Sequence, residues 1–455
     1  MAETKKQDMG TGSVKRKMVQ LAVPAVVAQV INLLYNIVDR IYIGHIPEIG
    51  AHALTGVGLF TPILMLITAF AMLAGSGGAP LAAIAMGRGE QDRAEKIMGN
   101  CFTVLLLMAV VLTGVFCAFI PELIRLFGGS GNTIPYGVSY GRIYSLGSVF
   151  VLVVMGMNPF ITTQGFAKIS MLTTVIGAVI NIILDPILIF ALDLGVAGAA
   201  IATVLSQAVS AVWILRFLTG KNTMLKLRFG NMILEPGVIL PCLGLGVSSF
   251  VMVSTESILS VSFTSSLFRY GGDVAVGAMT VLTSVNQVIS MPLVGICQGG
   301  QPLMSYNYGA GKLDRVKEAF LCQFTVCVSY ATVFWVLVQL FPSFFAGIFT
   351  NEQALVDYTA WAMRIFLAGC FSVGFQNSCQ QAFVALGQAK ISLFMACLRK
   401  LILLIPLIFI LPNFFQNKAM AVFLAEPVSD ILAAAAATTA FFLFFRRLMK
   451  TGKAE

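Results

Sequence analysis

The chain has 455 residues, of which 58% are hydrophobic and 11% are charged, and its mean hydropathy is +0.89. Soluble globular proteins carry about 25% charged residues, so this composition excludes a soluble enzyme, a soluble nucleic-acid-binding protein and a disordered chain. A membrane-spanning helix needs about 20 apolar residues, so the length accommodates roughly a dozen spans.

Apolar runs separated by glycine, proline and charged clusters predict twelve spans in chain order. The first six lie near residues 18–43, 54–84, 97–121, 134–157, 169–192 and 196–219. The second six lie near residues 238–268, 273–305, 316–342, 355–379, 390–412 and 418–446. Lipid offers no hydrogen-bond partner to free backbone groups, so each of these runs should form a helix.

An internal repeat relates the two sets of six spans, because two separate segments recur with the same offset of 222 residues. The matched residues are Gly77, Gly78, Pro80, Leu81, Gly87, Gly89, Asp92 and Arg93 with Gly299, Gly300, Pro302, Leu303, Gly309, Gly311, Asp314 and Arg315, and Gly165, Ala167, Lys168, Ile169 and Ser170 with Gly387, Ala389, Lys390, Ile391 and Ser392. Each half has an even number of spans, so both should have the same orientation, related by a pseudo-two-fold axis along the membrane normal. The predicted fold is an all-α integral membrane protein with twelve transmembrane helices in two six-helix bundles, residues 1–222 and 223–455.

The distribution of basic residues predicts the orientation in the membrane. With the N-terminus in the cytoplasm, 21 of the 29 Lys and Arg residues fall on the cytoplasmic side, as the positive-inside rule requires. The net charge of +9 is therefore a topology signal, and no nucleic-acid partner is expected. We expect a multi-pass protein of the inner or plasma membrane with both termini in the cytoplasm, in contact with membrane lipids and functional as a monomer.

Polar residues inside the first span form a candidate functional face. Asp39 follows Gln29, Asn32 and Asn36 at helical spacing, which places all four on one side of a helix. An ionisable side chain in a span is costly unless it faces a bundle interior or a wet cavity. Pro24, nearer the start of this span, is expected either to bend the helix as a moving part or to be an ordinary kink.

The fifth span carries a second polar group. Asn181 and Asp185 are one helical turn apart, and Pro186 cannot donate a hydrogen bond to the carbonyl of Ile182. The free carbonyl, the amide and the carboxylate together could hold a proton or ligate a small hard cation such as sodium. The alternative is a polar pair that joins two helices.

The second half has a different set of charges. Glu256 lies on the predicted seventh span, and Glu426 and Asp430 share a face of the twelfth. These acids form a candidate second site, for substrate or for holding the bundle together. The bases Arg364, Arg399 and Lys400 lie in the same half, so internal ion pairs are the alternative interpretation.

Several motifs are absent from the sequence. No GxxxxGK[ST] segment provides a phosphate cradle for ATP. The only two histidines, His45 and His52, lie in the first predicted external loop, which excludes an HExxH metal site and a histidine-based triad. The protein is therefore expected to be no enzyme and to use no cofactor beyond a proton or sodium ion, which would drive any uphill transport.

The pattern Leu34-Tyr35-Asn36-Ile37-Val38-Asp39, the block from Asn181 to Phe190 and the paired segments at the second and eighth spans resemble MATE (multidrug and toxic compound extrusion) transporters, nearest the MepA-like bacterial branch. The resemblance covers essentially the whole chain. It implies a pair of six-helix bundles that exports organic, often cationic, compounds by antiport with protons or sodium ions.

The resemblance also implies site residues. An ion site in the first bundle of related members falls on Asp39, Asn181, Asp185 and Thr203, the last of which rests on the resemblance alone. Another branch uses an acid on the seventh span, which Glu256 matches, and an Asp on the tenth, where this sequence offers Arg364. The alternatives are a flippase or exporter of a lipid-linked sugar or peptide-like metabolite, and a membrane protein without transport activity.

Overall fold

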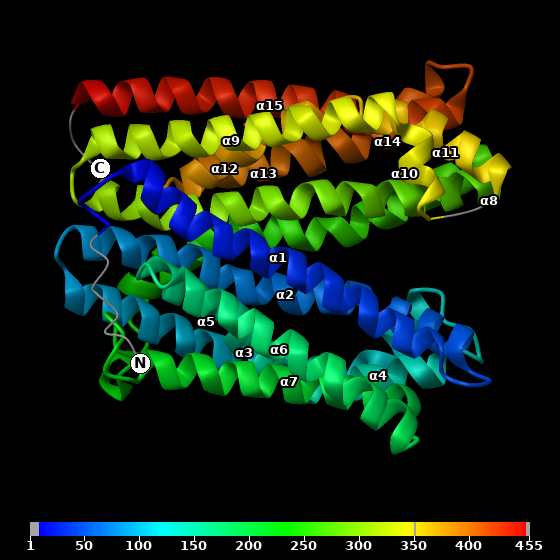
Figure 1. The fold of residues 1–455 in the computed structure, drawn as a ribbon, viewed down its shortest axis with the longest axis horizontal. Coiled ribbons are helices and arrows are strands. Elements are labelled where there is room, and N and C mark those ends of the chain that lie inside the picture. Colours follow the sequence, from blue (N-terminus) through cyan, green and yellow to red (C-terminus); the bar gives the residue numbers. More distant parts are fainter. Residues whose placement is uncertain (1–8, 350–351, 452–455) are drawn as a thin grey trace. The chain divides into compact units, whose positions relative to one another are not determined.

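The computed structural model describes residues 9–349 and 352–451, which form helices and turns without a β-strand (Figure 1). In the first half the helices are α1 (Val14–Gly44), α2 (Gly50–Gly87), α3 (Gln91–Leu126), α4 (Ile134–Leu146), α5 (Ser148–Thr163), α6 (Ala167–Pro186), η1 (Ile187–Ala191), α7 (Gly195–Leu218) and η2 (Phe229–Met232). They continue with α8 (Pro236–Gly309), α9 (Leu313–Leu340), α10 (Pro342–Gly347), α11 (Gln353–Phe366), α12 (Cys370–Ala385), α13 (Ala389–Cys397), η3 (Leu398–Leu404), α14 (Ile405–Ile410), η4 (Leu411–Asn413) and α15 (Lys418–Thr451). The predicted all-α membrane fold is confirmed.

Twelve membrane crossings follow from the lengths of these helices. Nine helical segments among the described residues are long and apolar enough to cross a membrane, and two bent helix pairs pass the same test together, which makes eleven. The 74-residue α8 would be about 110 Å long if straight, far more than the roughly 30 Å of a bilayer core. It is broken at Gly272, whose φ of 65° and ψ of −161° are not helical, and so supplies two crossings.

Two predicted spans differ from the expected single helices. The fourth is divided into α4 and α5, bent by 57° at Gly147, and the tenth into α11 and α12, bent by 47°. Gly147 and Gly369, which caps the start of α12, are 222 residues apart. Hydropathy counts apolar residues over a window and does not detect such breaks, so the prediction of two unbroken helices was wrong.

The repeat is visible in backbone conformation and in hydrogen bonds. The turn glycines Gly89 and Gly311 both have positive φ, at 79° and 70°, a region that glycine enters without steric cost. Asn158 donates to the carbonyl of Ser170, and at the same offset Gln380 donates to the carbonyl of Ser392. The two halves therefore share local structure as well as sequence.

The described chain forms two compact units. Unit 1 contains residue 9 and residues 27–250, and unit 2 contains residues 10–26 and the described residues from 251 onward. The start of α1 thus belongs to unit 2, and the start of α8 belongs to unit 1. These units share most, but not all, of their residues with the predicted bundles 1–222 and 223–455, and that division stays a prediction.

Close backbone contacts explain these assignments. In unit 1 a Cβ on Gly77 of α2 would overlap the backbone of Cys242 near the start of α8. In unit 2 a Cβ on Gly299 of α8 would overlap the backbone of Ala22 near the start of α1. Gly77 and Gly299 are repeat partners, so the same small residue permits the same close approach in each unit.

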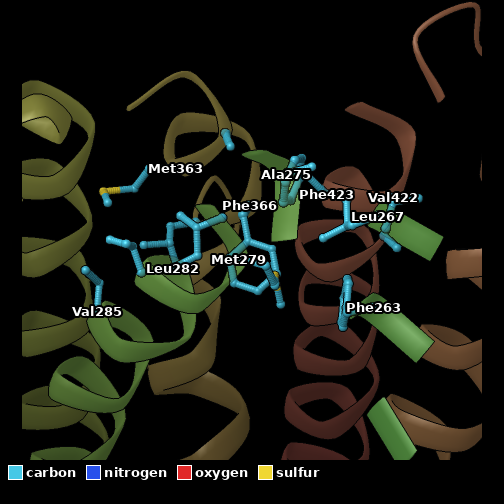
Figure 2. Packing of buried hydrophobic residues seen from close by; sticks show 14 of the residues in the cluster. Phe263, Leu267, Ala275, Met279, Leu282, Val285, Met363, Phe366, Val422 and Phe423 are labelled. Carbon is cyan, nitrogen blue, oxygen red and sulfur yellow. The ribbon is translucent and has the colours of Figure 1, made fainter. Parts of the chain in front are cut away.

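The interior of unit 2 is filled by a hydrophobic cluster from several helices. Figure 2 shows Phe263 and Met279 of α8, Phe366 of α11 and Phe423 of α15 within it. The rings of Phe263 and Phe366 meet edge to face with their centroids 5.8 Å apart. This packing holds α8, α11 and α15 together beside the charged residues described below.

Candidate functional site

The candidate site in unit 1 is built by α1, α6 and α7. Asp39 lies on the part of α1 that belongs to unit 1, and Asn181 and Asp185 lie one turn apart on α6. Thr203 lies on α7. Asn181, Asp185 and Thr203 are buried, and Asp39 is half-buried.

Direct contacts join these four residues. The amide nitrogen of Asn181 lies 3.3 Å from Oδ1 of Asp185 and 3.5 Å from Oγ1 of Thr203. The carboxyl groups of Asp39 and Asp185 lie within hydrogen-bonding reach of each other. The structure therefore brings together the residues of α1, α6 and α7 that the sequence and the resemblance had indicated; their role in ion coupling stays a prediction.

A contact between two carboxyl groups has a direct chemical consequence. A carboxylate only accepts hydrogen bonds, so a bond between Asp39 and Asp185 requires a proton on one of them. Two ionised carboxylates about 4 Å apart would repel by about 4 kcal/mol at an effective dielectric constant of about 20. The pair is thus suited to hold one positive charge between them, as a proton or as a metal cation.

Unsatisfied oxygen atoms support this interpretation. Oδ1 of Asp39, Oδ1 of Asn181 and Oδ2 of Asp185 are buried and have no hydrogen-bond partner. Buried polar atoms normally have a partner, and carboxylate and amide oxygens are the ligands of hard cations. No ion pair among the described residues includes Asp39 or Asp185. The residues present fit a small cation or a proton.

Three tyrosines that the sequence analysis did not select complete the site. Tyr35 of α1 interacts electrostatically with both Asp39 and Asp185. Tyr140 of α4 lies near Thr203, and its ring stacks on that of Tyr144 with centroids 6.0 Å apart. Tyr35 lies on α1, and Tyr140 and Tyr144 lie on α4, the first part of a broken span, so hydropathy along the chain gave no signal that they meet at one site.

Unit 2 carries a separate network of charges. Arg399 of η3 lies 2.7 Å from Oδ1 of Asp430 and 3.4 Å from Oε1 of Glu426. Lys400, the next residue, pairs with Glu256 of α8 and donates to the carbonyl of Met252 at 2.6 Å. The acids of the candidate second site are therefore paired with bases, and whether they also bind substrate stays a prediction.

Other predicted residues lie elsewhere. Arg364 is exposed in the last turn of α11, and Asp357, an acid on the same helix that the sequence analysis passed over, accepts a hydrogen bond from Gln353. Pro24 lies inside the continuous α1, and Pro186 ends α6 where the π-helical η1 begins. Across residues 9–349 and 352–451 no cluster of three or more His, Cys, Asp and Glu residues could hold a metal ion. The functional roles of Arg364, Pro24 and Pro186 stay predictions.

A family model described as MatE matches the chain twice, over residues 24–187 and 247–410. The two matched segments cover most of both halves and start 223 residues apart, one residue more than the offset of the repeat. The chain belongs to the MatE family. It is a multi-pass membrane protein of a transporter family and not an enzyme.

Individual relatives agree with the MatE assignment. Two proteins named "Multidrug export protein MepA" are each 24% identical to this chain: that of Staphylococcus saprophyticus over 89% of this chain and 88% of its own length, and that of Staphylococcus haemolyticus over 92% of each. Among solved structures, "Crystal structure of MATE in the bent conformation" has a TM-score of 0.92 at 23% identity and covers 99% of both chains. A MOP superfamily transporter from Pyrococcus furiosus has a TM-score of 0.91 at 22% identity, over 99% of this chain and 100% of its own. At these identities the structural likeness shows the MatE fold.

Proposed function

We propose that this MatE-family protein is a secondary antiporter that exports organic, often cationic, compounds from the cell in exchange for protons or sodium ions. The observation that carries the proposal is the contact between Asp39 and Asp185, with three buried oxygens that lack partners. Export of several drugs is the activity named for the MepA relatives. The plasma membrane, with both termini in the cytoplasm, is the proposed location, and a monomer among lipids is the proposed working form.

The exchange would follow from alternative occupation of one acidic site. A cation that arrives from outside neutralises the Asp39–Asp185 pair, and the amide of Asn181 and hydroxyl of Thr203 complete its surroundings. Binding would favour the conformation in which the carboxyl groups are held together, because a ligand shifts a protein toward the state it binds better. Pro24 and Pro186 are the proposed points at which α1 and the end of α6 bend during exchange.

The membrane potential would supply part of the driving force. An inside-negative potential of 100 mV contributes about 2.3 kcal/mol for each positive charge that moves inward. Exchange gains from this potential when more charge enters with the ions than leaves with the substrate. Export of a compound with one positive charge therefore needs either more than one ion in return or a concentration gradient of the exchanged ion.

The test is efflux of a fluorescent organic cation from proteoliposomes with an imposed proton or sodium gradient. Asp39→Asn and Asp185→Asn should each abolish gradient-driven efflux, because the amide cannot carry the exchanged charge. Asp193→Asn is the matched control, since Asp193 is exposed with φ of 52°, a conformation that Asn tolerates. Normal efflux by both variants would refute the coupling role, and transport of a lipid-linked sugar without dye efflux would favour the flippase.

A further inference from the structure

The ammonium group of Lys400 lies where a free cation would be expected to bind. It contacts the carboxylate of Glu256 and the carbonyl oxygen of Met252, both on α8. One carboxylate and one backbone carbonyl, a helical turn apart, are oxygen ligands of the kind that monovalent and hard cations take in proteins. Lys400 therefore occupies the carboxylate of Glu256 and the carbonyl oxygen of Met252, the two groups of α8 that would otherwise attract an ion.

Burial distinguishes the two partners of this pair. The Lys400 side chain is 6% exposed, whereas that of Glu256 is 52% exposed. An ammonium group that is buried must be paired, since an isolated buried charge is costly. The carboxylate, by contrast, would be open to an external cation if the lysine were absent.

Lys400 is the base in ion-pair contact with Glu256 among the described residues, while Arg399 acts on Glu256 only at longer range. Arg399 uses Nε and a terminal nitrogen on Asp430, at 2.8 and 2.7 Å, and reaches Glu426 at 3.4 Å. Its backbone carbonyl accepts the hydroxyl of Ser429, which fixes the start of the π-helical η3 against α15. Arg399 is thus committed to the acids of α15, and Lys400 is the base available to α8.

Unit 1 has no counterpart of this arrangement. At the repeat offset of 222, Lys400 corresponds to Ala178 and Glu256 corresponds to Leu34. The acids of unit 1, Asp39 and Asp185, instead face each other, and no ion pair among the described residues includes either; Arg40, next to Asp39, interacts with it electrostatically but forms no ion pair. One unit therefore has a carboxyl pair that needs a cation, and the other has a carboxylate that already holds one.

We propose that Lys400 is a tethered cation that takes the place of an exchangeable ion at Glu256, so that unit 2 binds no coupling ion. Ion exchange is then confined to Asp39 and Asp185, and in this respect the inference rests on the proposed function. Lys400 acts as a positioning residue: it determines how many ions the protein binds without touching the exchanged ion.

The test counts bound cations in the purified protein and exchanged cations in proteoliposomes. Lys400→Met should bind one more sodium ion than the wild type, measured by ²²Na⁺ binding, or, where the ion is a proton, should take it up at Glu256 in place of the proton that Lys400 carried, and should exchange one more cation per substrate. Glu256→Gln should leave the ²²Na⁺ count and the number of cations exchanged per substrate unchanged, because the wild-type carboxylate holds no external ion; a proton lost from the unpaired Lys400 is not an exchanged ion. The double variant Glu256→Gln with Lys400→Met should also match the wild type, because the carboxylate that would take the extra ion is gone.

Two results would overturn the tethered-cation proposal. One is a folded Lys400→Met protein with unchanged ²²Na⁺ binding and an unchanged number of cations exchanged per substrate. The other is a Glu256→Gln protein that binds one sodium ion fewer or exchanges one cation fewer per substrate, and this second variant decides the question if Lys400→Met does not fold. The binding count needs no working transport, so it stands apart from the efflux assay: loss of gradient dependence in the wild type would refute the antiport and not the role of Lys400.

Discussion

Gln164 fixes the segment between the two halves of the chain to unit 1, and its replacement by Leu should release that segment. Its side-chain oxygen accepts hydrogen bonds from the hydroxyl of Thr223 at 2.8 Å and from the backbone nitrogens of Met224 at 2.7 Å and Leu225 at 2.9 Å. Gln164 is fully buried. Its repeat partner is Leu386, so the substitution introduces the residue that the second half already has.

The expected cost follows from the two backbone groups left without an acceptor. A buried unsatisfied donor costs about 1–3 kcal/mol, and partial access of water to the released segment favours the lower end, so about 3 kcal/mol is expected in total. Hydrogen exchange at Met224 and Leu225 should then be roughly 100-fold faster, since 1.4 kcal/mol corresponds to a factor of 10 in a local opening equilibrium.

The assay is hydrogen–deuterium exchange of the detergent-purified protein, with two controls. Gln164→Glu keeps an acceptor for the two backbone nitrogens and should retain most of their protection. Gln353→Leu removes an exposed glutamine that bonds to Asp357 and should leave the linker unchanged. Unaltered exchange at Met224 and Leu225 in Gln164→Leu would refute the reasoning.

Three further substitutions test the packing and the site. Gly77→Ala should destabilise unit 1 and lower the thermal midpoint, because its Cβ would overlap the backbone of Cys242, whereas Gly244→Ala meets no atom within 4 Å and should be neutral or slightly stabilising. Gly272→Ala should cost about 1–3 kcal/mol in a denaturation assay, since φ of 65° with ψ of −161° is a glycine conformation; an unchanged midpoint would contradict the observed break. Thr203→Val preserves shape but removes the hydroxyl beside Asn181, so efflux should weaken while the free energy of unfolding stays within about 1 kcal/mol of wild type; unaltered efflux would exclude Thr203 from the site.

Much of the architecture could be predicted from the sequence, because the bilayer imposes long apolar helices and the repeat divides them into two sets. The breaks at Gly147 and Gly369 could not be predicted, because a glycine within an apolar run is compatible with a continuous membrane helix. The boundary predicted between the seventh and eighth spans, at residues 268–273, agrees with the break of α8 at Gly272.

The sequence could predict the part of the candidate site whose residues lie on one helix. It could not predict the part whose residues meet across different helices. Asn181 and Asp185 are one turn apart, so helical periodicity places them together. Tyr140 reaches Thr203 across 63 positions of sequence, and no spacing rule indicates such a contact. The sequence analysis gave ion pairs between acids and bases of the second half as one interpretation, without naming the pairs. Which base pairs with Glu256 depends on how α8 and η3 pack.

Direct measurement of the ions that cross with the substrate tests the central claim most closely. Proteoliposomes with purified protein would be given an organic cation on one side, with proton and sodium movements recorded separately. The account predicts that one of the two ions moves in the opposite direction in fixed proportion to the substrate, and that Asp185→Asn removes this movement. Substrate transport at a normal rate with neither ion moving would contradict it.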